Sequence, residues 1–305
     1  MLLSRTQAIL TLESGPEIIK IADRALKAAG ANGKLPTPIE DLILAAKVVE
    51  DKDTEGTVRR FLSSLSESSR SLFHSTLQKV RGIADLRQRA VYVPADTAPR
   101  QRFAKGHELG HQIIPWHRIG ADRVPAFYKD NDYTLSPFVT DLFDIEANFF
   151  SSEVIFQGKR FAERVRDYKP SFDAVFLLSD LHGASRQATL RRFVEEQDEI
   201  LASISYLPSH YDRADGFPVL RAPRLIGSHG FNRRYACIRL PAQLLPHHPW
   251  AEARNSQELC SGEIDLDCDG PSVRFEWQAW WNNYSLLILL RRRPLLGMVS
   301  RLFQQ

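Results

Sequence analysis

The segment KGHELGH, residues 105–111, is the feature that most constrains the fold of this chain. It spaces His107, Glu108 and His111 as H-E-x-x-H. On an α-helix, residues four positions apart lie on the same face, so the two imidazoles can bind one ion. Glu108 then lies beside the metal, where its carboxylate can take a proton from a water molecule. The pattern therefore predicts a helix that carries a catalytic zinc site.

A catalytic zinc takes three protein ligands and keeps one position open, so a third ligand must come from elsewhere. Residues 138–156 are expected to form a second helix, and within it Asp144 and Glu146 are the available carboxylates. Two residues two positions apart lie about 200° apart around a helix, so only one of them can face the ion. Apolar residues occur nearly all round this helix, so periodicity leaves both candidates open.

Two glycines, Gly106 and Gly110, lie inside the predicted motif helix. Each glycine in a helix interior costs about 1 kcal/mol relative to alanine. Close approach of another backbone, such as a sheet or a bound substrate, would account for both. A surface helix that carries H-E-x-x-H by chance is therefore the weaker interpretation.

The segments before the motif predict helices followed by a small sheet. Helical periodicity is present over residues 16–33 and again around 56–65, and Thr37 is the expected N-cap of a helix between them. Two short strands are expected within GIADLRQRAVYVP, and the clearer one is Ala90–Val93. An open edge of that strand would allow an extended peptide to pair with it.

Residues 116–137 are expected to form a long loop, because they are rich in Asp, Tyr, Pro and Asn. A loop of this length inside a compact unit tends to be functional. His117, Tyr128 and Tyr133 are therefore candidate donors to the oxyanion that forms during peptide hydrolysis. Sequence does not distinguish them, and packing is the simpler interpretation of each.

The C-terminal third changes to Pro, Gly and strand-like segments. Residues 263–290 predict a three-strand meander, with a two-residue turn at Asn282-Asn283. Its aromatic residues either line a ligand pocket in a sensory domain or are core and cross-strand pairs. These residues are Trp277, Trp280, Trp281 and Tyr284.

The expected fold class is α+β, in four parts. Residues 1–15 are a tail, and residues 16–158 are a mainly helical zinc-peptidase domain with a small β-sheet. Residues 159–204 are a helical segment similar to a helix-turn-helix, and residues 205–305 are a β-rich C-terminal domain and candidate sensor.

The run RQRFAKGHELGH, followed by a helix with an E-x-x-A-N/D pattern, resembles the ImmA/IrrE family of metallo-endopeptidases. The likeness covers roughly residues 16–195, from PTPIEDLILAAK through GIADLRQRAVYV to EANFFSSEVIFQ and LHGASRQATLRRF. The register of such gluzincin-like sites implies Asp144 as the third ligand, where the family normally has Glu, and Asn148 as a supporting residue one turn further on. Glu146 remains the alternative ligand.

The same resemblance implies a cofactor and a substrate. The cofactor is Zn²⁺, and the protein substrate is a helix-turn-helix repressor. Its cleavage would switch on stress-response or mobile-element genes.

A DNA-binding transcriptional regulator, or a metal-dependent sensor with little turnover, is the alternative function. LSDLHGASRQATLRRF is similar to a helix-turn-helix, with Arg186, Arg191 and Arg192 on or near its second helix. A formal net charge of only +3 argues against a concentrated basic surface. Solvated arginines on helices that pack against the peptidase unit are therefore the favoured interpretation.

Composition and termini predict a cytoplasmic protein with no membrane partner. The three cysteines, Cys237, Cys260 and Cys268, are odd in number and have no close-spaced pair, which argues against a disulfide framework and for a reducing compartment. The N-terminus does not resemble a secretory signal. The apolar run Leu286–Leu290 is far shorter than the roughly 20 residues that cross a bilayer.

Overall fold

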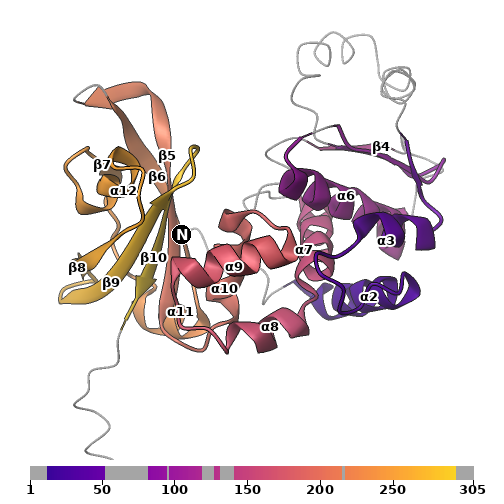
Figure 1. The fold of residues 1–305 in the computed structure, drawn as a ribbon, viewed down its shortest axis with the longest axis horizontal. Helices are drawn as coiled ribbons and strands as arrows, with labels where there is room; N and C mark the ends of the chain where they lie inside the picture. The colour runs from indigo at the N-terminus through magenta and orange to yellow at the C-terminus, as the bar shows by residue number, and fades with distance from the viewer. Residues whose placement is uncertain are drawn as a thin grey trace, which may run out of the picture. The chain divides into compact units, whose positions relative to one another are not determined.

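A computed structural model describes residues 12–51, 82–94, 96–118, 127–130, 141–214 and 217–292 of the 305-residue chain. It confirms the expected α+β class, with helices and two separate sheets (Figure 1). The helix expected around residues 56–65 lies outside the described residues.

The chain forms two compact units. The described residues of the N-terminal unit fall within Ile9–Glu163 and Leu178–Ser185. Those of the C-terminal unit fall within Arg164–Leu177 and Arg186–Gln305.

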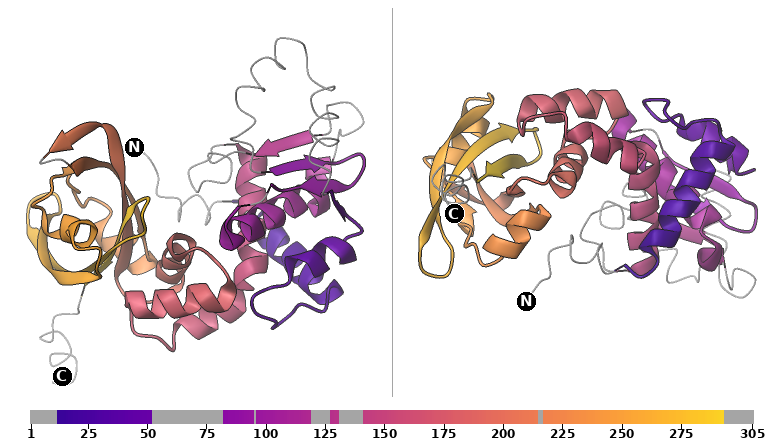
Figure 2. Two further views of the ribbon diagram at one scale, coloured as in Figure 1. Left: turned by 45° about the horizontal axis from the view of Figure 1, so that its top comes forward. Right: turned by 90° about the horizontal axis from the view of Figure 1, so that it is seen from below.

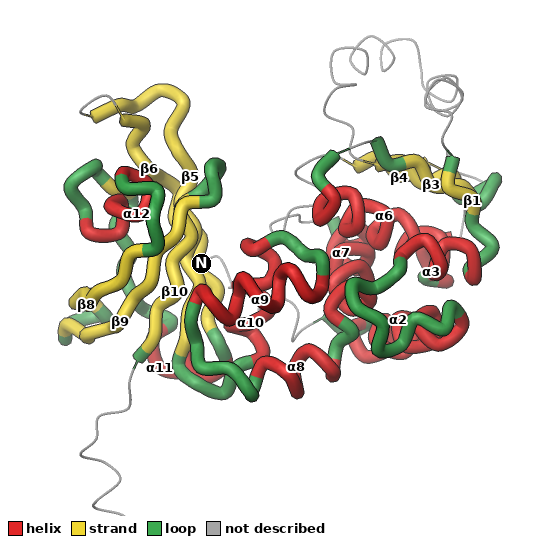
Figure 3. Tube along the Cα trace, viewed as in Figure 1, coloured by secondary structure: helices red, strands yellow, loops and turns green. Residues whose placement is uncertain are grey.

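The N-terminal unit consists of helices and a four-stranded sheet (Figure 3). Its helices are α2 (Gly15–Ala28), α3 (Ile39–Ala45), α6 (Ala98–Ile113), the 3-10 helix η2 (Pro115–Arg118), α7 (Leu142–Phe156) and α8 (Lys159–Val165). Its strands are β1 (Val49–Glu50), β2 (Gly82–Asp85), β3 (Ala90–Tyr92) and β4 (Phe127–Asp130), in the order β1-β3-β2-β4. Strands β1 and β3 are parallel, and the other neighbours are antiparallel.

The sheet differs from the sequence prediction in two ways. Strand β3 pairs with β1 on one side and β2 on the other, so the open edge expected at Ala90–Val93 is wrong. Strand β4 lies within residues 116–137, which were expected to be a loop. Among the described strands, β1 and β4 are the edges. The four residues of β4, FYKD, do not alternate between apolar and polar, so no period-two pattern identifies this short strand.

Helices α6 and α7 pack closely because α6 carries two glycines on the face that meets α7. A Cβ added at Gly110 would lie 3.2 Å from the Cα of Ala147 and 3.1 Å from Cδ1 of Phe150. A Cβ added at Gly106 would lie 2.5 Å from Oγ of Ser151. The close approach expected at both glycines is therefore made by another helix rather than by a sheet or a substrate.

Two buried polar side chains tie other elements to these helices. The Nε2 atom of Gln112 on α6 donates to the carbonyls of Asp85 and Ala90, at 2.8 and 3.0 Å, and so fixes β2 and β3 against the helix. Thr37 was expected to cap α3, but Pro38 holds the N-cap position. The Thr37 hydroxyl instead donates to the carbonyl of Val154 on α7, at 2.9 Å.

The C-terminal unit is built on a curled antiparallel sheet of six strands (Figure 2). The strand order is β7-β6-β5-β10-β9-β8. The strands are β5 (Leu201–Ala214), β6 (Phe217–Gly227), β7 (Gln243–Leu244), β8 (Cys260–Asp267), β9 (Ser272–Trp281) and β10 (Leu286–Arg291). The remaining elements are α10 (Arg186–Glu196), α11 (His229–Tyr235), η3 (Pro249–Ala251) and α12 (Glu252–Asn255). Helix α9 (Phe172–His182) belongs to this unit up to Leu177 and to the N-terminal unit from Leu178 onward.

Strands β8, β9 and β10 form the expected three-strand meander. Its second turn is longer than predicted, because β9 ends at Trp281 and β10 begins at Leu286. The Oδ1 atom of Asn282 accepts from the backbone N–H groups of Tyr284 and Ser285, at 2.9 and 2.7 Å. The side chain of Asn282 thus organises a four-residue loop in place of a two-residue turn.

The aromatic residues of the meander do not line one pocket. Trp277 belongs to the core of the sheet, and Trp281 packs against the same core. Trp280 packs against Phe176 instead, with ring centroids 5.1 Å apart. Tyr284 is 76% exposed. The core and cross-strand interpretation is therefore the better one.

Within the part of the chain that the structure describes, no helix has the length and apolar character needed to cross a membrane.

Replacing Gly110 by alanine is expected to lower the free energy of unfolding of the N-terminal unit by about 1–3 kcal/mol. The added methyl group meets the backbone of α7, which cannot move aside as a flexible side chain can. Denaturant unfolding measures the change. The matched control is Gly230→Ala in α11, where the nearest atom to the added Cβ is 3.4 Å away. Equal losses in the two variants would contradict the explanation by helix packing.

Candidate metal centre

Helix α6 presents the H-E-x-x-H residues in the interior of the N-terminal unit. Pro99 stands in its first turn, and the helix ends just before Pro115, as the sequence predicts. The side chains of His107, Glu108 and His111 are fully buried. The Nε2 atoms of the two histidines face each other at 3.0 Å.

The first turn of α7 brings Asp144 to these histidines. Oδ1 of Asp144 lies 3.7 Å from Nε2 of His111. One ligand atom from each of His107, His111 and Asp144 lies within 4.8 Å of the others, and no other group of three metal-ligating side chains is found among the described residues. Asp141 caps α7 by accepting from the backbone N–H groups of Phe143 and Asp144, at 2.9 and 3.4 Å, and so holds this turn in place.

Asn148, one turn along α7, supports the first histidine. Its Oδ1 atom lies 3.0 Å from Nδ1 of His107. An amide oxygen can only accept, so Nδ1 of His107 carries the proton and Nε2 keeps its lone pair for a metal.

A chain of buried groups supports the second histidine. Nδ1 of His111 lies 3.0 Å from Nδ1 of His117, and Nε2 of His117 lies 2.7 Å from Oε2 of Glu146. The carboxylate can only accept, so His117 donates from Nε2 and accepts from His111 at Nδ1. This order of donors again leaves Nε2 of His111 without a proton, as binding of a metal requires.

This series of hydrogen-bonded groups ends at the carboxylate of Glu146, which several donors hold. Glu146 also accepts from Nε1 of Trp116, at 2.7 Å, and from the hydroxyl of Ser14. Burial lowers the pKa of His117, while the bond to Glu146 acts in the opposite direction. A neutral His117 is the form that this order of donors requires.

The structure brings only some of the predicted site residues together. Asp144 joins the two histidines, while Glu146, the alternative ligand, lies behind His117. His117, a candidate oxyanion donor, contacts the Nδ1 side of His111, away from the ligand atoms. Tyr128 lies in β4 opposite Ala84, and Tyr133 is outside the described residues.

The support given by His117, Trp116 and Glu146 was not predicted from the sequence. These three residues come from η2 and α7, and no spacing rule connects the two elements. The only available signal was that Glu146 is an acidic residue in a largely apolar helix, which indicates a buried partner.

Glu108 lies against the sheet. A Cβ added at Gly82, the first residue of β2, would overlap the carboxylate of Glu108 and would lie 3.0 Å from its Cγ. The carboxylate is thus confined between α6 and the start of β2. Glu108 follows His107 in the same helix turn, so the H-E-x-x-H segment contributes a buried carboxyl group as well as the two histidines.

The donor set is able to bind a metal ion. It has two neutral imidazole nitrogens and one carboxylate oxygen, with each imidazole oriented through its other nitrogen. Three protein ligands leave positions open for a water molecule or a substrate, as in catalytic rather than structural sites.

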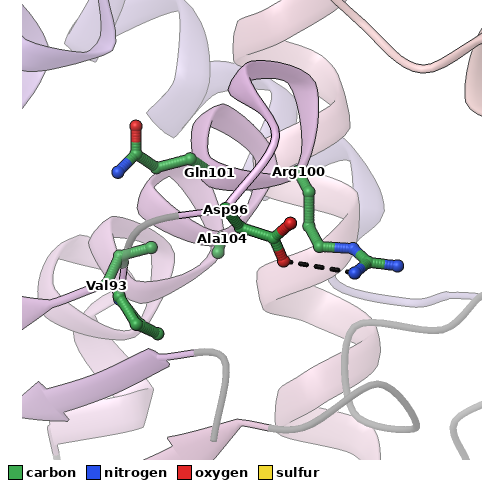
Figure 4. Close-up of a pocket in the computed structure, with 6 residues that line it drawn as sticks. Val93, Asp96, Arg100, Gln101 and Ala104 are labelled. Atoms are coloured by element: carbon green, nitrogen blue, oxygen red, sulfur yellow. Dashed lines mark hydrogen bonds and ion pairs between the residues drawn. The ribbon is translucent and has the colours of Figure 1, made fainter.

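A shallow surface hollow lies near the start of α6 (Figure 4). It is lined by Val93, Pro94, Asp96, Arg100, Gln101 and Ala104. Arg100 reaches Asp96 at 3.1 Å, an ion pair four residues apart at the start of the helix. The hollow contains none of the metal-ligating residues and accounts for no part of the centre.

The arginines of the helix-turn-helix-like segment, which DNA binding would require to be available, are engaged within the C-terminal unit. The guanidinium of Arg186 lies 4.5 Å from the ring centroid of Phe176 and 5.2 Å from that of Trp280. Arg191 pairs with Glu195 at 3.2 Å, and Arg192 pairs with Glu196 at 2.8 Å. Each arginine is therefore held by an aromatic ring or a carboxylate.

Neither a protein-family model nor a curated protein sequence matches the chain. Among solved structures, the chain is similar to a protein described as a "Mycobacterium tuberculosis transcriptional regulator". The TM-score is 0.50 at 10% sequence identity, and the match covers 90% of this chain and 75% of that chain. At this identity the likeness shows the fold alone.

Replacing His117 by phenylalanine is expected to weaken metal binding by about 10–100-fold, because Nδ1 of His111 loses the group that fixes its proton. Competition with a chromophoric chelator measures the dissociation constant for zinc. The matched control is His182→Phe, since His182 is as deeply buried in the same unit and its Nδ1 lies 3.2 Å from the backbone carbonyl of Ile155 rather than near a ligand histidine. Equal affinities in the two variants would show that His117 gives no support.

Proposed function

We propose that this chain is a zinc-dependent endopeptidase of the ImmA/IrrE type. The observation that carries the proposal is a His107–His111–Asp144 group whose ligand atoms lie within 4.8 Å of one another, on a helix where the buried Glu108 directly follows His107. Two imidazoles, one carboxylate and an open position are the ligand arrangement of catalytic zinc in peptidases. The family resemblance of the sequence supports the same conclusion.

Each residue of the centre has a separate proposed role. His107, His111 and Asp144 hold the ion, and zinc, when bound, supplies a Lewis acid that polarises the scissile carbonyl. Glu108 accepts the proton of the attacking water and later passes it to the leaving amine. The carboxylate is well placed for both transfers because the backbone at Gly82 limits its movement.

The substrate is proposed to be a helix-turn-helix repressor, bound as an extended segment. The substrate class rests on the family resemblance. Binding as an added strand is supported by β4, a described edge of the sheet that pairs with β2, the strand whose first residue contacts Glu108. Backbone pairing at an exposed sheet edge is a common way to hold an extended peptide.

The Glu108→Gln variant tests the proposed activity. It is expected to keep the metal and to lose cleavage by about 10²–10⁴-fold, because the amide cannot take a proton from water. Mapping of newly formed N-termini in a lysate of the organism, after incubation with wild type or variant plus zinc, measures the cleavage. Identical sets of N-termini in the two samples would exclude peptidase activity under these conditions.

Metal content tests the ligand set separately from turnover. Wild type is expected to bind one zinc per chain, and His107→Ala and Asp144→Ala are expected to lose it. Glu146→Ala is expected to bind one zinc at saturating concentration with weaker affinity, since Glu146 only supports a ligand through His117. Complete loss of zinc in Glu146→Ala, together with retention of zinc in Asp144→Ala, would show that Glu146 and not Asp144 is the third ligand.

A transcriptional regulator that binds DNA, or a metal-dependent sensor, is the second candidate function. The similar fold of the Mycobacterium tuberculosis protein named a transcriptional regulator favours it. Contacts within the C-terminal unit engage Arg186, Arg191 and Arg192, which argues against α10 as a DNA-recognition helix. A band shift of duplex DNA that weakens steeply with salt would support this candidate.

A further inference from the structure

Two cysteines that are far apart in the sequence meet in the C-terminal unit. The sulfur atoms of Cys237 and Cys268 lie 2.6 Å apart. The third cysteine, Cys260, makes separate contacts, at 3.6 Å to the hydroxyl of Ser256 and 3.8 Å to the carbonyl of Glu258. The sequence spacing, which argued against a disulfide, did not show that the fold brings one pair together.

The backbone holds this pair in place. Cys237 follows α11, and Cys268 follows the last residue of β8. Ile238 and Cys268 form an antiparallel bridge, and the N–H group of Arg239 donates to the carbonyl of Asp267 at 2.9 Å. The two sulfurs are therefore adjacent because their main chains are paired, not because of one side-chain rotamer.

The chemistry of the pair favours oxidation over metal binding. A sulfur–sulfur bond is about 2.05 Å long, so only a small movement separates the two thiols from a covalent link. Cys237 is exposed and Cys268 is partly exposed, so a small oxidant can reach them. Neither cysteine belongs to a group of three metal-ligating side chains among the described residues.

The two thiols also divide the chemical roles. The hydrogen bond to Cys237 raises the pKa of the Cys268 thiol to about 11, and the nearby charge of Asp269 acts in the same direction. Cys237 is also the more exposed of the two sulfurs, so it is the one that an oxidant reaches first.

We propose that Cys237 and Cys268 are a reversible dithiol–disulfide pair that a peroxide oxidises. The sulfur of Cys237 attacks one peroxide oxygen, the O–O bond breaks, and a sulfenic acid and water form from hydrogen peroxide. The sulfur of Cys268 then attacks the sulfenic sulfur, the S–S bond forms, and a second water leaves with the proton of the Cys268 thiol. A small dithiol reverses the reaction by thiol–disulfide exchange.

The disulfide closes a loop that contains β7, η3, α12 and β8. It ties β8, an edge strand of the six-stranded sheet, to the end of α11. Closing a loop of this length restricts the unfolded chain, so the oxidised C-terminal unit is expected to be the more stable form. In a reducing compartment such a bond is typically transient and redox-sensing.

The test uses the full-length protein and hydrogen peroxide at about one equivalent. The wild type has three cysteines, and oxidation is expected to leave one reactive thiol and a mass lower by about 2 Da, with a Cys237–Cys268 link in the peptide map. A small dithiol restores three thiols. The thermal midpoint of the C-terminal unit is expected to be higher in the oxidised than in the reduced protein.

Single variants assign the pair. Cys260→Ser is expected to form the link as the wild type does. In Cys237→Ser and Cys268→Ser, neither the decrease in mass of about 2 Da nor the shift of the thermal midpoint is expected. Three remaining thiols in oxidised wild type, or irreversible addition of oxygen at Cys237, would overturn the proposal. A link that involves Cys260 would overturn it as well. None of these outcomes depends on the metal centre or on peptidase activity.

Discussion

The close contact between α6 and α7 is the constraint on which the centre depends. Two glycines on α6 let the helices approach until the backbone at Gly110 faces Ala147. At that separation the first turn of α7 brings Asp144 to the histidines of α6, and the next turn brings Asn148 to Nδ1 of His107. A larger separation would remove a ligand and a supporting residue together, so the packing of two helices determines whether a metal site exists.

The hydrogen-bond partners around the centre determine which nitrogen of each ligand histidine carries the proton. Asn148 on one side and Glu146, through His117, on the other both require protons on the Nδ1 atoms of the ligand histidines. A buried carboxyl group needs hydrogen-bond partners, and Glu146 has three of them. The centre therefore depends on groups that never touch the ion.

Signals within short stretches of sequence predicted helix α6 and the three-strand meander. The bounds of α6 follow from Pro99 and Pro115, and the meander follows from alternating residues in β8, β9 and β10. The register of the resemblance indicated Asp144, which periodicity left open. Contacts between distant segments were not predictable, because neither the His117–Glu146 bond nor the Cys237–Cys268 contact has a sequence spacing that identifies it.

The position of Gly82 has a consequence for how this protein can evolve. Any other residue there would place its first side-chain atom where the carboxylate of Glu108 lies. The start of β2 thus constrains the Glu108 side chain although Gly82 itself contributes no functional group. We expect glycine to persist at this position in related chains while the outer positions of the sheet vary.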